Sequence, residues 1–178
     1  MSLSHTTFSG NTYEQGLAHG EILKESIINN IEIYVNRFEN EAGVDKNELL
    51  ENSGIYLNIL REQSPEYVNG MNGIAESSGL GLLEIAMLNL RYELLYHALG
   101  RKLQYDAVDG CTSFAILQEE VENNHLLMGQ NWDWIPDVEC VLTTSIDTDG
   151  MRRMAFTEAG IFGGKPGMNS EGVGLTVN

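Results

Sequence analysis

The stretch Asp109-Gly110-Cys111-Thr112-Ser113-Phe114-Ala115-Ile116 divides the chain into two parts with different hydrophobic periods. Between residues 12 and 99, apolar residues recur with the 3.6-residue period of helices. After residue 110 the period drops to two, which is typical of strands with one buried face. We therefore expect an α+β chain in which a helical segment precedes a β-meander, with the boundary in the polar segment 101–110.

Cap and stop signals divide the helical part. Asn11 or Thr12 can begin the first helix, and Asp45 can cap the second, with Glu48 in the capping-box position. The expected helices span 12–42, 46–63, 65–78 and 82–99; glycines 43, 79 and 100 follow the first, third and fourth. The positions expected to face inward are Leu17, Ile28, Ile31, Val35, Phe38, Leu49, Ile55, Tyr56, Ile59, Leu60, Leu83, Ala86, Met87, Leu90, Leu94 and Leu95.

Period-two segments predict the strands, at 112–118, 125–132, 141–147, 151–158 and 173–178. The turn Thr148-Asp149-Gly150 predicts a tight hairpin, because an Asp-Gly pair accepts positive φ. The glycine-rich stretch 160–167 is not a phosphate-binding loop. Lys165 is followed by Pro166 instead of Ser or Thr, and the stretch follows a strand without opening a helix.

Composition excludes several classes of function. The 178 residues contain 26 acidic and 10 basic side chains, a net charge of −16, and both parts of the chain are acidic. Such a surface repels nucleic acids and anionic membranes. No stretch approaches the ~20 apolar residues of a membrane span. The N-terminus has neither the basic region nor the apolar run of a signal peptide, so we expect a cytoplasmic protein.

The cysteines and histidines indicate no metal site. Two cysteines, Cys111 and Cys140, are too few for a disulfide scaffold or a four-cysteine metal site. No two of the four histidines stand four residues apart, so no zinc-binding helix motif occurs. Because the two cysteines lie 29 positions apart, a Cys-x-x-Cys redox pair is disfavoured. We expect neither a metal nor a cofactor.

Cys111 follows glycine at the start of an expected strand, which suits a self-cleavage reaction. Gly110 has no side chain to block attack of the thiol on its carbonyl carbon. The acyl group would pass from nitrogen to sulfur, and water would then release a new chain that begins with Cys111. The freed α-amino group would serve the thiol as a built-in base. The alternative is that Cys111 is simply a small buried apolar side chain.

Asp133 lies between Trp132 and Trp134 at the end of the second expected strand. A carboxylate held in an apolar frame can orient a charged amine, such as the α-amino group of a cleaved chain. The alternative is an ordinary surface residue at a strand end.

These two motifs resemble a known family. Asp-Gly-Cys-Thr-Ser-Phe at 109–114 and Met-Gly-Gln-Asn-Trp-Asp-Trp at 128–134 resemble the acyl-coenzyme A:6-aminopenicillanic acid acyltransferase family. This is the C45 peptidase family of the N-terminal nucleophile (Ntn) hydrolases, and it is related to the choloylglycine hydrolases. Residues 13–20 and 167–178 resemble the family's first helix and glycine-rich hairpin.

The resemblance implies a precursor, or zymogen, that cleaves itself autocatalytically between Gly110 and Cys111. Residues 1–110 would form a helical pro-segment or small subunit. Residues 111–178 would begin the nucleophile-headed subunit, which is part of an αββα sandwich. Cys111 would be the nucleophile and Asp133 would hold its α-amino group.

The resemblance also implies the binding residues. Asn178 stands at the position of an asparagine that donates to the oxyanion, and such a donor contributes on the order of 10²–10³ in rate. Gln130 and Asn131 belong to the second motif and are candidates for contacting substrate or oxyanion. In choloylglycine relatives the position of Gln130 is commonly arginine, so this chain lacks that charge.

The implied function is a thiol protease-like hydrolase or acyltransferase acting on amide or thioester bonds of a small molecule, with acyl-coenzyme A as a possible substrate. The strands after residue 110 are too few for two sheets and two helical layers, so we expect a fragment or one part of a split protein. A homo-oligomer stays open. The alternative function is a non-catalytic or inactive fragment that retains the fold as a binding or assembly module.

Overall fold

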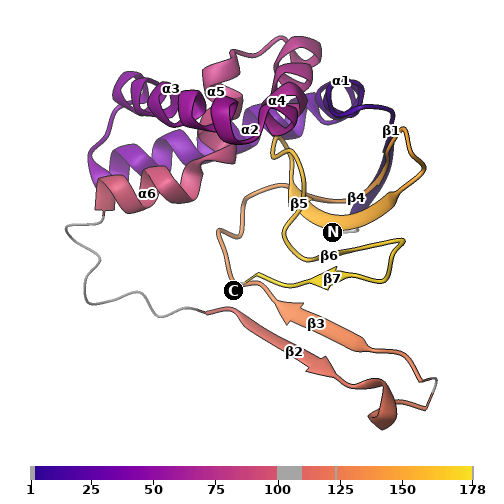
Figure 1. Cartoon of the computed structure of the whole chain (residues 1–178). Coiled ribbons are helices and arrows are strands. Elements are labelled where there is room, and N and C mark those ends of the chain that lie inside the picture. The colour runs from indigo at the N-terminus through magenta and orange to yellow at the C-terminus, as the bar shows by residue number, and fades with distance from the viewer. Residues whose placement is uncertain (1–2, 100–109, 123, 178) are drawn as a thin grey trace.

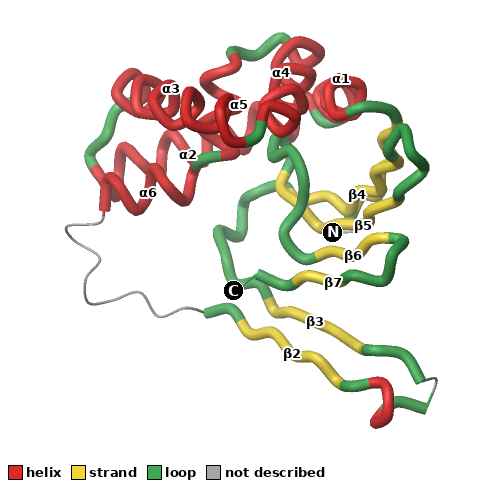
Figure 2. The backbone as a smooth tube through the Cα atoms, viewed as in Figure 1, coloured by secondary structure: helices red, strands yellow, loops and turns green. Residues whose placement is uncertain are grey.

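The computed structural model describes residues 3–99, 110–122 and 124–177. In these residues it contains six α-helices and seven strands, so the α+β prediction is confirmed at that level. The helices gather on one side of the molecule, and the strands lie on the other (Figures 1 and 2). The hairpin of β2 (Thr112–Ile116) and β3 (Leu127–Asn131) projects from the strand side, away from the helices (Figure 1).

The helical part contains two more breaks than the sequence predicts. Its helices are α1 (Thr12–Ile22), α2 (Lys24–Arg37), α3 (Lys46–Gln63), α4 (Pro65–Ser78), α5 (Leu82–Asn89) and α6 (Arg91–Leu99), with a π-helical turn η1 (Phe38–Ala42) after α2. The expected helices 12–42 and 82–99 are each divided, at Leu23 and at Leu90, where the backbone leaves the helical conformation. Both leucines are buried, so tertiary packing causes these bends without a local stop signal.

The predicted N-caps at Asn11 and Asp45 are confirmed, whereas Gly100, the expected stop of the fourth helix, lies outside the described residues. The side chain of Asn11 accepts the N–H of Glu14 at 3.0 Å, while the Glu14 carboxylate accepts the N–H of Asn11 at 2.8 Å. Asp45 accepts the N–H groups of Asn47 and Glu48 at the start of α3. Gly79 ends α4 in the left-handed conformation, which side chains disfavour.

The inward-facing positions are only partly as expected. Eight are buried, namely Ile31, Phe38, Leu49, Ala86, Met87, Leu90, Leu94 and Leu95. Another five are half-buried: Leu17, Ile28, Val35, Tyr56 and Leu60. The prediction is wrong for Ile55, Ile59 and Leu83, which are exposed. The reason for the first two is that α3 lies at the outside of the helical layer and buries only the narrow stripe Leu49, Ser53 and Leu57.

The main sheet draws on both parts of the chain. Its order is β1-β4-β5-β6-β7, from strands β1 (Ser4–Ser9), β4 (Cys140–Ile146), β5 (Arg152–Glu158), β6 (Gly167–Asn169) and β7 (Gly174–Leu175). Strand β1, which the sequence does not predict, pairs in parallel with β4 from Ser4 opposite Val141 to Ser9 opposite Ile146. The predicted β4–β5 hairpin is confirmed, with Gly150 at φ 88°.

The first two expected strands do not join this sheet, so the prediction of one continuous meander is wrong. Strands β2 (Thr112–Ile116) and β3 (Leu127–Asn131) form a separate antiparallel hairpin, with a 3-10 turn η2 (Gln118–Glu120) between them. The chain after β3 packs against the helices before it enters β4, and this detour separates the two sheets. The expected last strand, 173–178, is strand only at β7, while the glycine-rich region contributes β6.

We call the contacts between the helices and residues 134–165 the helix–sheet interface. Asn30 of α2 donates to the carbonyl oxygens of Glu139 and Ala159, both at 3.0 Å, and accepts the N–H of Glu139 at 2.8 Å. Buried His19 of α1 accepts the N–H of Gly160 through Nε2 at 2.9 Å. These bonds satisfy buried polar groups on both sides, which fixes the helices on the sheet.

A buried ionic cluster lies in the same interface and comprises Tyr34, Arg91, Trp134, Glu158 and Lys165; we call it the Glu158 cluster. Glu158 is 1% exposed. Its Oε1 accepts from Arg91 Nη2 at 2.8 Å and from Lys165 Nζ at 2.5 Å, and its Oε2 accepts from the Tyr34 hydroxyl at 2.6 Å. The Tyr34 oxygen in turn accepts from Trp134 Nε1 at 2.6 Å. A buried carboxylate is stable only with such partners.

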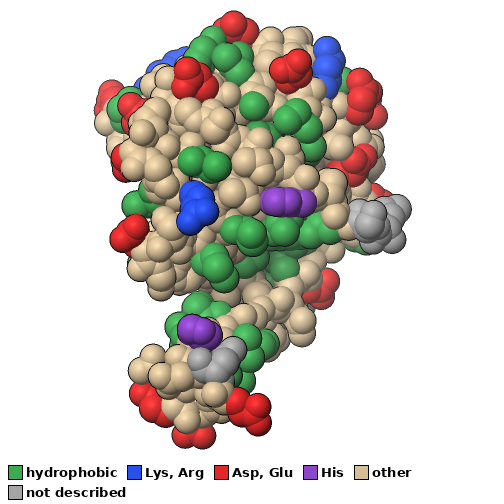
Figure 3. Space-filling view, turned by 90° about the vertical axis from the view of Figure 1, so that its right-hand side faces the viewer, with side chains coloured by type: hydrophobic (Ala, Val, Ile, Leu, Met, Phe, Trp, Pro, Cys, Tyr) green, Lys and Arg blue, Asp and Glu red, His purple; other side chains and the backbone are tan. Residues whose placement is uncertain are grey.

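Acidic and apolar side chains occupy different parts of the molecular surface. In Figure 3, acidic side chains surround the outline of the molecule, while hydrophobic ones gather over the strand side. The exposed apolar residues of the strand side include Phe114, Leu117, Leu126, Leu127, Met168, Val173 and Leu175. None of the helices in the described part of the chain combines the length and the apolar character needed to cross a bilayer.

Candidate active site

Cys111 directly precedes β2 and lies beside the segment that follows β3. Thr112 pairs with Asn131, so the same antiparallel register, continued beyond the hairpin, brings Trp132 opposite Cys111 and Asp133 opposite Gly110. The Cys111 Sγ lies 3.9 Å from the backbone carbonyl oxygen of Asp133. The thiol is half-buried, so it is neither sealed in the core nor fully open.

Gly110 packs against the Asp133 side chain. A Cβ added to Gly110 would overlap the Asp133 carboxylate and would lie only 3.0 Å from its Cγ. Only glycine therefore allows the backbone to approach the carboxylate this closely. Gly110 and Cys111 thus both contact Asp133, the glycine at its side chain and the thiol at its backbone oxygen, although 22 positions separate Cys111 from Asp133.

The surroundings of Asp133 differ from the expected apolar frame, because the Asp133 side chain is exposed. The rings of Trp132 and Trp134 stack on each other, with centroids 6.0 Å apart, and turn toward the helix–sheet interface. The two tryptophans hold the backbone of this segment, which leaves the carboxylate facing solvent and Gly110.

The remaining predicted residues are placed differently. Gln130 lies on β3, and its side-chain amide both donates to the carbonyl oxygen of Val177 and accepts the N–H of Val177. Its polar atoms therefore link the hairpin to the chain after β7. Asn131 is exposed at the end of β3, opposite Thr112. Asn178 lies outside the described residues.

The segment 132–134 is anchored by residues that the sequence analysis did not identify. Lys165 Nζ lies 3.7 Å from the centroid of the Trp132 ring, and it donates to the hydroxyl of Tyr92 at 3.0 Å. The ring of Tyr92 packs on Trp134 at 5.1 Å. The sequence offers two weak signals for this anchor: Glu158 is a charged residue at the end of an apolar strand, and Lys165 lies in a glycine-rich stretch. Neither signal indicates a partner that lies far away in the chain.

Burial shifts the acidity of several of these groups. Burial, reinforced by the charge of Arg91, lowers the pKa of Lys165 to about 8, although Glu158 opposes the shift. Burial and the neighbouring Glu158 carboxylate raise the pKa of Tyr34. Burial also raises the pKa of Cys140 to about 11, so the Cys140 thiol is a poor nucleophile at neutral pH.

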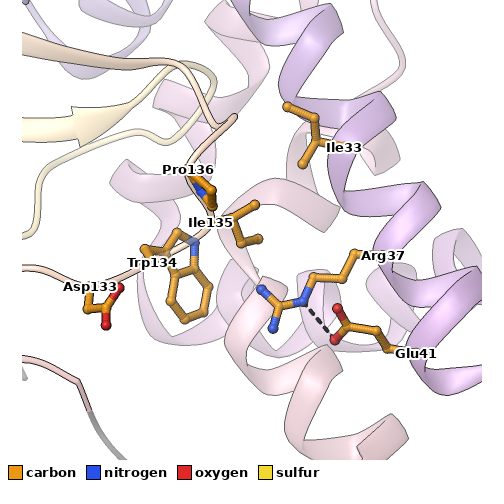
Figure 4. Close-up of a pocket in the computed structure, with 7 residues that line it drawn as sticks. All are labelled: Ile33, Arg37, Glu41, Asp133, Trp134, Ile135 and Pro136. Atoms are coloured by element: carbon orange, nitrogen blue, oxygen red, sulfur yellow. Dashed lines mark hydrogen bonds and ion pairs between the residues drawn. The ribbon is translucent and has the colours of Figure 1, made fainter.

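An open pocket of about 500 Å³ adjoins Asp133 on the side of α2 (Figure 4). Trp134 and Arg37 form facing parts of its wall, with the guanidinium carbon 5.4 Å from the centroid of the Trp134 ring. Arg37 also pairs with Glu41 at 2.9 Å. The pocket gives a small molecule access to the vicinity of Asp133.

Two other chemistries find no support in the geometry. Within residues 3–99, 110–122 and 124–177, no three His, Cys, Asp or Glu side chains gather as they would around a metal ion. Cys111 and Cys140 are not bridged to each other.

Comparison with known proteins agrees with the motifs. No protein-family model matches the chain. Over 176 residues, 98% of its length, the chain is 30% identical to the acyl-coenzyme A:6-aminopenicillanic-acid-acyltransferase 40 kDa form of Emericella nidulans. The chain spans about half the length of that relative, 46%. The predicted resemblance to the acyl-coenzyme A:6-aminopenicillanic acid acyltransferase family is confirmed over the part of the relative that the chain spans.

Proposed function

We propose that this chain carries the nucleophile of a self-cleaving cysteine amidohydrolase or acyltransferase. One observation carries the proposal: Gly110 lies against the Asp133 carboxylate while the Cys111 Sγ lies 3.9 Å from the Asp133 backbone oxygen. Self-cleavage needs a thiol next to the preceding backbone carbonyl, and the mature enzyme needs an acceptor for the new α-amino group. The similarity of the chain to the acyltransferase of Emericella nidulans supports the same assignment.

In this proposal the Cys111 sulfur attacks the Gly110 carbonyl, and hydrolysis of the resulting thioester separates residues 1–110 from residues 111–178. Asp133 then holds the freed ammonium of Cys111 through its carboxylate and its backbone oxygen. The uncharged amine activates the thiol for attack on an amide or thioester substrate, forming an acyl-enzyme.

The oxyanion donors lie at the end of the hairpin and beyond β7. We assign Asn178 and Asn131 as candidate donors. Because both polar atoms of the Gln130 amide are engaged with Val177, we assign Gln130 to positioning the chain that leads to Asn178, and not to contacting substrate.

The proposal extends to the fold and the substrate class. The five-stranded sheet would be one of the two sheets of an αββα Ntn sandwich, with the rest supplied outside the part that this chain spans. The name of the relative contains an acyl-coenzyme A and an amine acceptor. We propose a small acyl thioester or amide as the substrate here, and the open pocket beside Asp133 gives such a molecule access.

The test is the intact mass of the purified chain. The wild type should give two pieces that meet between Gly110 and Cys111, and Cys111→Ala should give one uncut chain. Gly110→Ala should also slow cleavage, because the new methyl group displaces the Asp133 carboxylate. Gly54→Ala is the matched control, since the nearest atom to its added methyl is 3.6 Å away. A wild type that stays uncut contradicts the proposal.

A second candidate function is favoured by the exposed apolar side chains of the hairpin and of β6 and β7. A binding or assembly module would present such a surface to a partner protein. Iodoacetamide labelling separates the two functions. An enzyme should lose its activity as Cys111 is labelled, well before Cys140, whereas a binding module should keep its partner affinity when Cys111 is blocked.

A further inference from the structure

The glycine-rich stretch 160–167 is not a phosphate-binding loop, but its backbone is fixed on β5. The Lys165 N–H donates to the carbonyl oxygen of Phe156, in β5, at 3.0 Å. Gly164 has no room for a side chain, because an added Cβ would overlap the Cβ of Ala155. Glycine thus allows the stretch to lie close on the strand, and the hydrogen bond sets where Lys165 stands along it.

From this position the Lys165 side chain reaches the segment 132–134. Its Nζ lies 3.7 Å from the centroid of the Trp132 ring, 5.2 Å from that of Trp134 and 5.1 Å from that of Tyr92. An ammonium at such distances is attracted to the faces of aromatic rings, most strongly to tryptophan and where water is excluded. Lys165 is buried, so its charge holds these rings with little screening by solvent.

The ammonium of Lys165 is itself held in place. It donates to the Glu158 carboxylate at 2.5 Å and to the Tyr92 hydroxyl at 3.0 Å. The Phe156 ring, on the strand that carries the glycine-rich stretch, packs edge-on against the Trp132 ring with centroids 5.5 Å apart. Trp132 is therefore held by a cation and by a ring whose positions are both set by β5.

The position of Trp132 matters to the reaction because the next residue is Asp133. The Asp133 side chain lies against Gly110, and its backbone oxygen lies 3.9 Å from the Cys111 Sγ. Since the Asp133 side chain is exposed, its place depends on the backbone that Trp132 and Trp134 hold on either side.

We propose that Lys165 is a positioning residue for the reaction: its ammonium holds the Trp132 ring and thereby keeps Asp133 against Gly110 and Cys111. After cleavage, the same contact keeps the Asp133 carboxylate where the new ammonium of Cys111 forms. A displacement of about 1 Å at a reacting group can slow a reaction by about 10²-fold. The glycine-rich stretch thus serves to present a cation to the segment 132–134. The inference rests on the proposed function.

The experiment follows self-cleavage of the freshly translated full chain on denaturing gels. Lys165→Met keeps an unbranched apolar side chain but removes the charge, and should slow cleavage by about 10- to 100-fold. Lys165→Arg keeps a cation that stacks on aromatic rings, and should cleave close to the wild-type rate. Lys165→Met should still fold, because Glu158 keeps Arg91 as its counter-ion.

Trp132→Leu tests the same contact from its other side. It removes the ring that the ammonium faces, so it should slow cleavage to a similar extent. The double variant Trp132→Leu, Lys165→Met should be no slower than the slower single variant, because both changes break one contact. Effects that multiply in the double variant would overturn the inference.

Lost stability is the competing explanation, and Leu57→Ala controls for it. Leu57 is buried in α3, at the outside of the helical layer, so its truncation should lower the urea midpoint of unfolding. The folded Leu57→Ala chain should nevertheless cleave like the wild type; equal slowing in this control and in Lys165→Met would overturn the inference.

Two further outcomes would overturn this inference alone. One is a Lys165→Met chain that is folded by circular dichroism and cleaves like the wild type. The other is a Lys165→Arg chain as slow as Lys165→Met, since the cation would then not be what matters. A wild type that never cleaves overturns the proposed function and this inference with it.

Discussion

Two segments form the candidate site: residues 132–134, which we call the packed wall, and the β2–β3 hairpin, which we call the hairpin wall. They are held in place in opposite ways. The Trp132–Trp134 segment is fastened to the helix–sheet interface through buried partners, including Tyr34 and Lys165. The β2–β3 hairpin, which follows Cys111, has strands that are mostly exposed, and Gln130 links it to Val177. The comparison teaches that Asp133 is set by tertiary packing, whereas Cys111 is set by strand pairing and by its contact with Asp133.

The largest expected effect comes from breaking the packed wall at Glu158. Glu158→Gln removes the carboxylate that pairs with both Arg91 and Lys165, so these two buried cations lose their shared counter-ion. We expect a loss of about 3–5 kcal/mol in the free energy of unfolding, measured by urea denaturation.

Asp147→Asn is the control for Glu158→Gln. It removes a partly exposed carboxylate that pairs with Arg153, and should lower the free energy of unfolding by less than about 1 kcal/mol. Equal losses in the two variants would show that the Glu158 cluster is no stronger than a surface pair, and the contrast between the two walls would fail.

The next largest effect is a pH dependence of the free energy of unfolding, which arises at His19 in the helix–sheet interface. Burial lowers the pKa of His19 to about 4, against about 6.5 for an unfolded histidine. Between these values the unfolded chain binds a proton that the folded chain excludes, so stability is full above pH 6.5 and falls as pH drops toward 4. The expected loss is about 3 kcal/mol, visible in unfolding curves taken at successive pH values.

His19→Gln should remove this part of the pH dependence, because glutamine can accept the Gly160 N–H without titrating in this range. His5→Gln, at an exposed histidine that contacts Thr144, should leave it unchanged. A His19→Gln protein that still loses the same stability between pH 6.5 and 4 would assign the dependence to other groups.

The smallest effect concerns the hairpin wall. Gln130→Ala removes both side-chain bonds to Val177, and each such bond is worth about 1 kcal/mol. Hydrogen exchange should speed up for the amides of β2 and β3, while those of β4 and β5 keep their protection. Gln118→Ala, at the far end of the hairpin, is the control. If β4 and β5 lose protection equally, the hairpin and the sheet form one cooperative unit, and the contrast is weaker than described.

Sequence patterns predicted those features whose causes are local. The caps at Asn11 and Asp45 and the turn at Gly150 each depend on residues within a few positions, so a short stretch of sequence carries the full signal. The positions of Cys111 and Asp133 could be anticipated as well, because a simple hairpin register brings them together.

What the sequence did not reveal depends on partners far away in the chain. Strand β1 forms because β4 offers it an edge, 137 positions after Ser4. The bends at Leu23 and Leu90 follow from packing that no local pattern records. The Glu158 cluster joins residues from α2, α6 and β5, and the charges of its members, considered one by one, predict surface positions.

The helix–sheet interface joins residues from before and after the Gly110–Cys111 bond, and this decides whether the two pieces would separate after cleavage there. His19, Asn30, Tyr34 and Arg91 come from before that bond, and the groups that they bind come from after it. Strand β1 is likewise paired with a strand from the later part. The two polypeptides would therefore stay associated after cleavage. They would elute together in size-exclusion chromatography and separate only in denaturant.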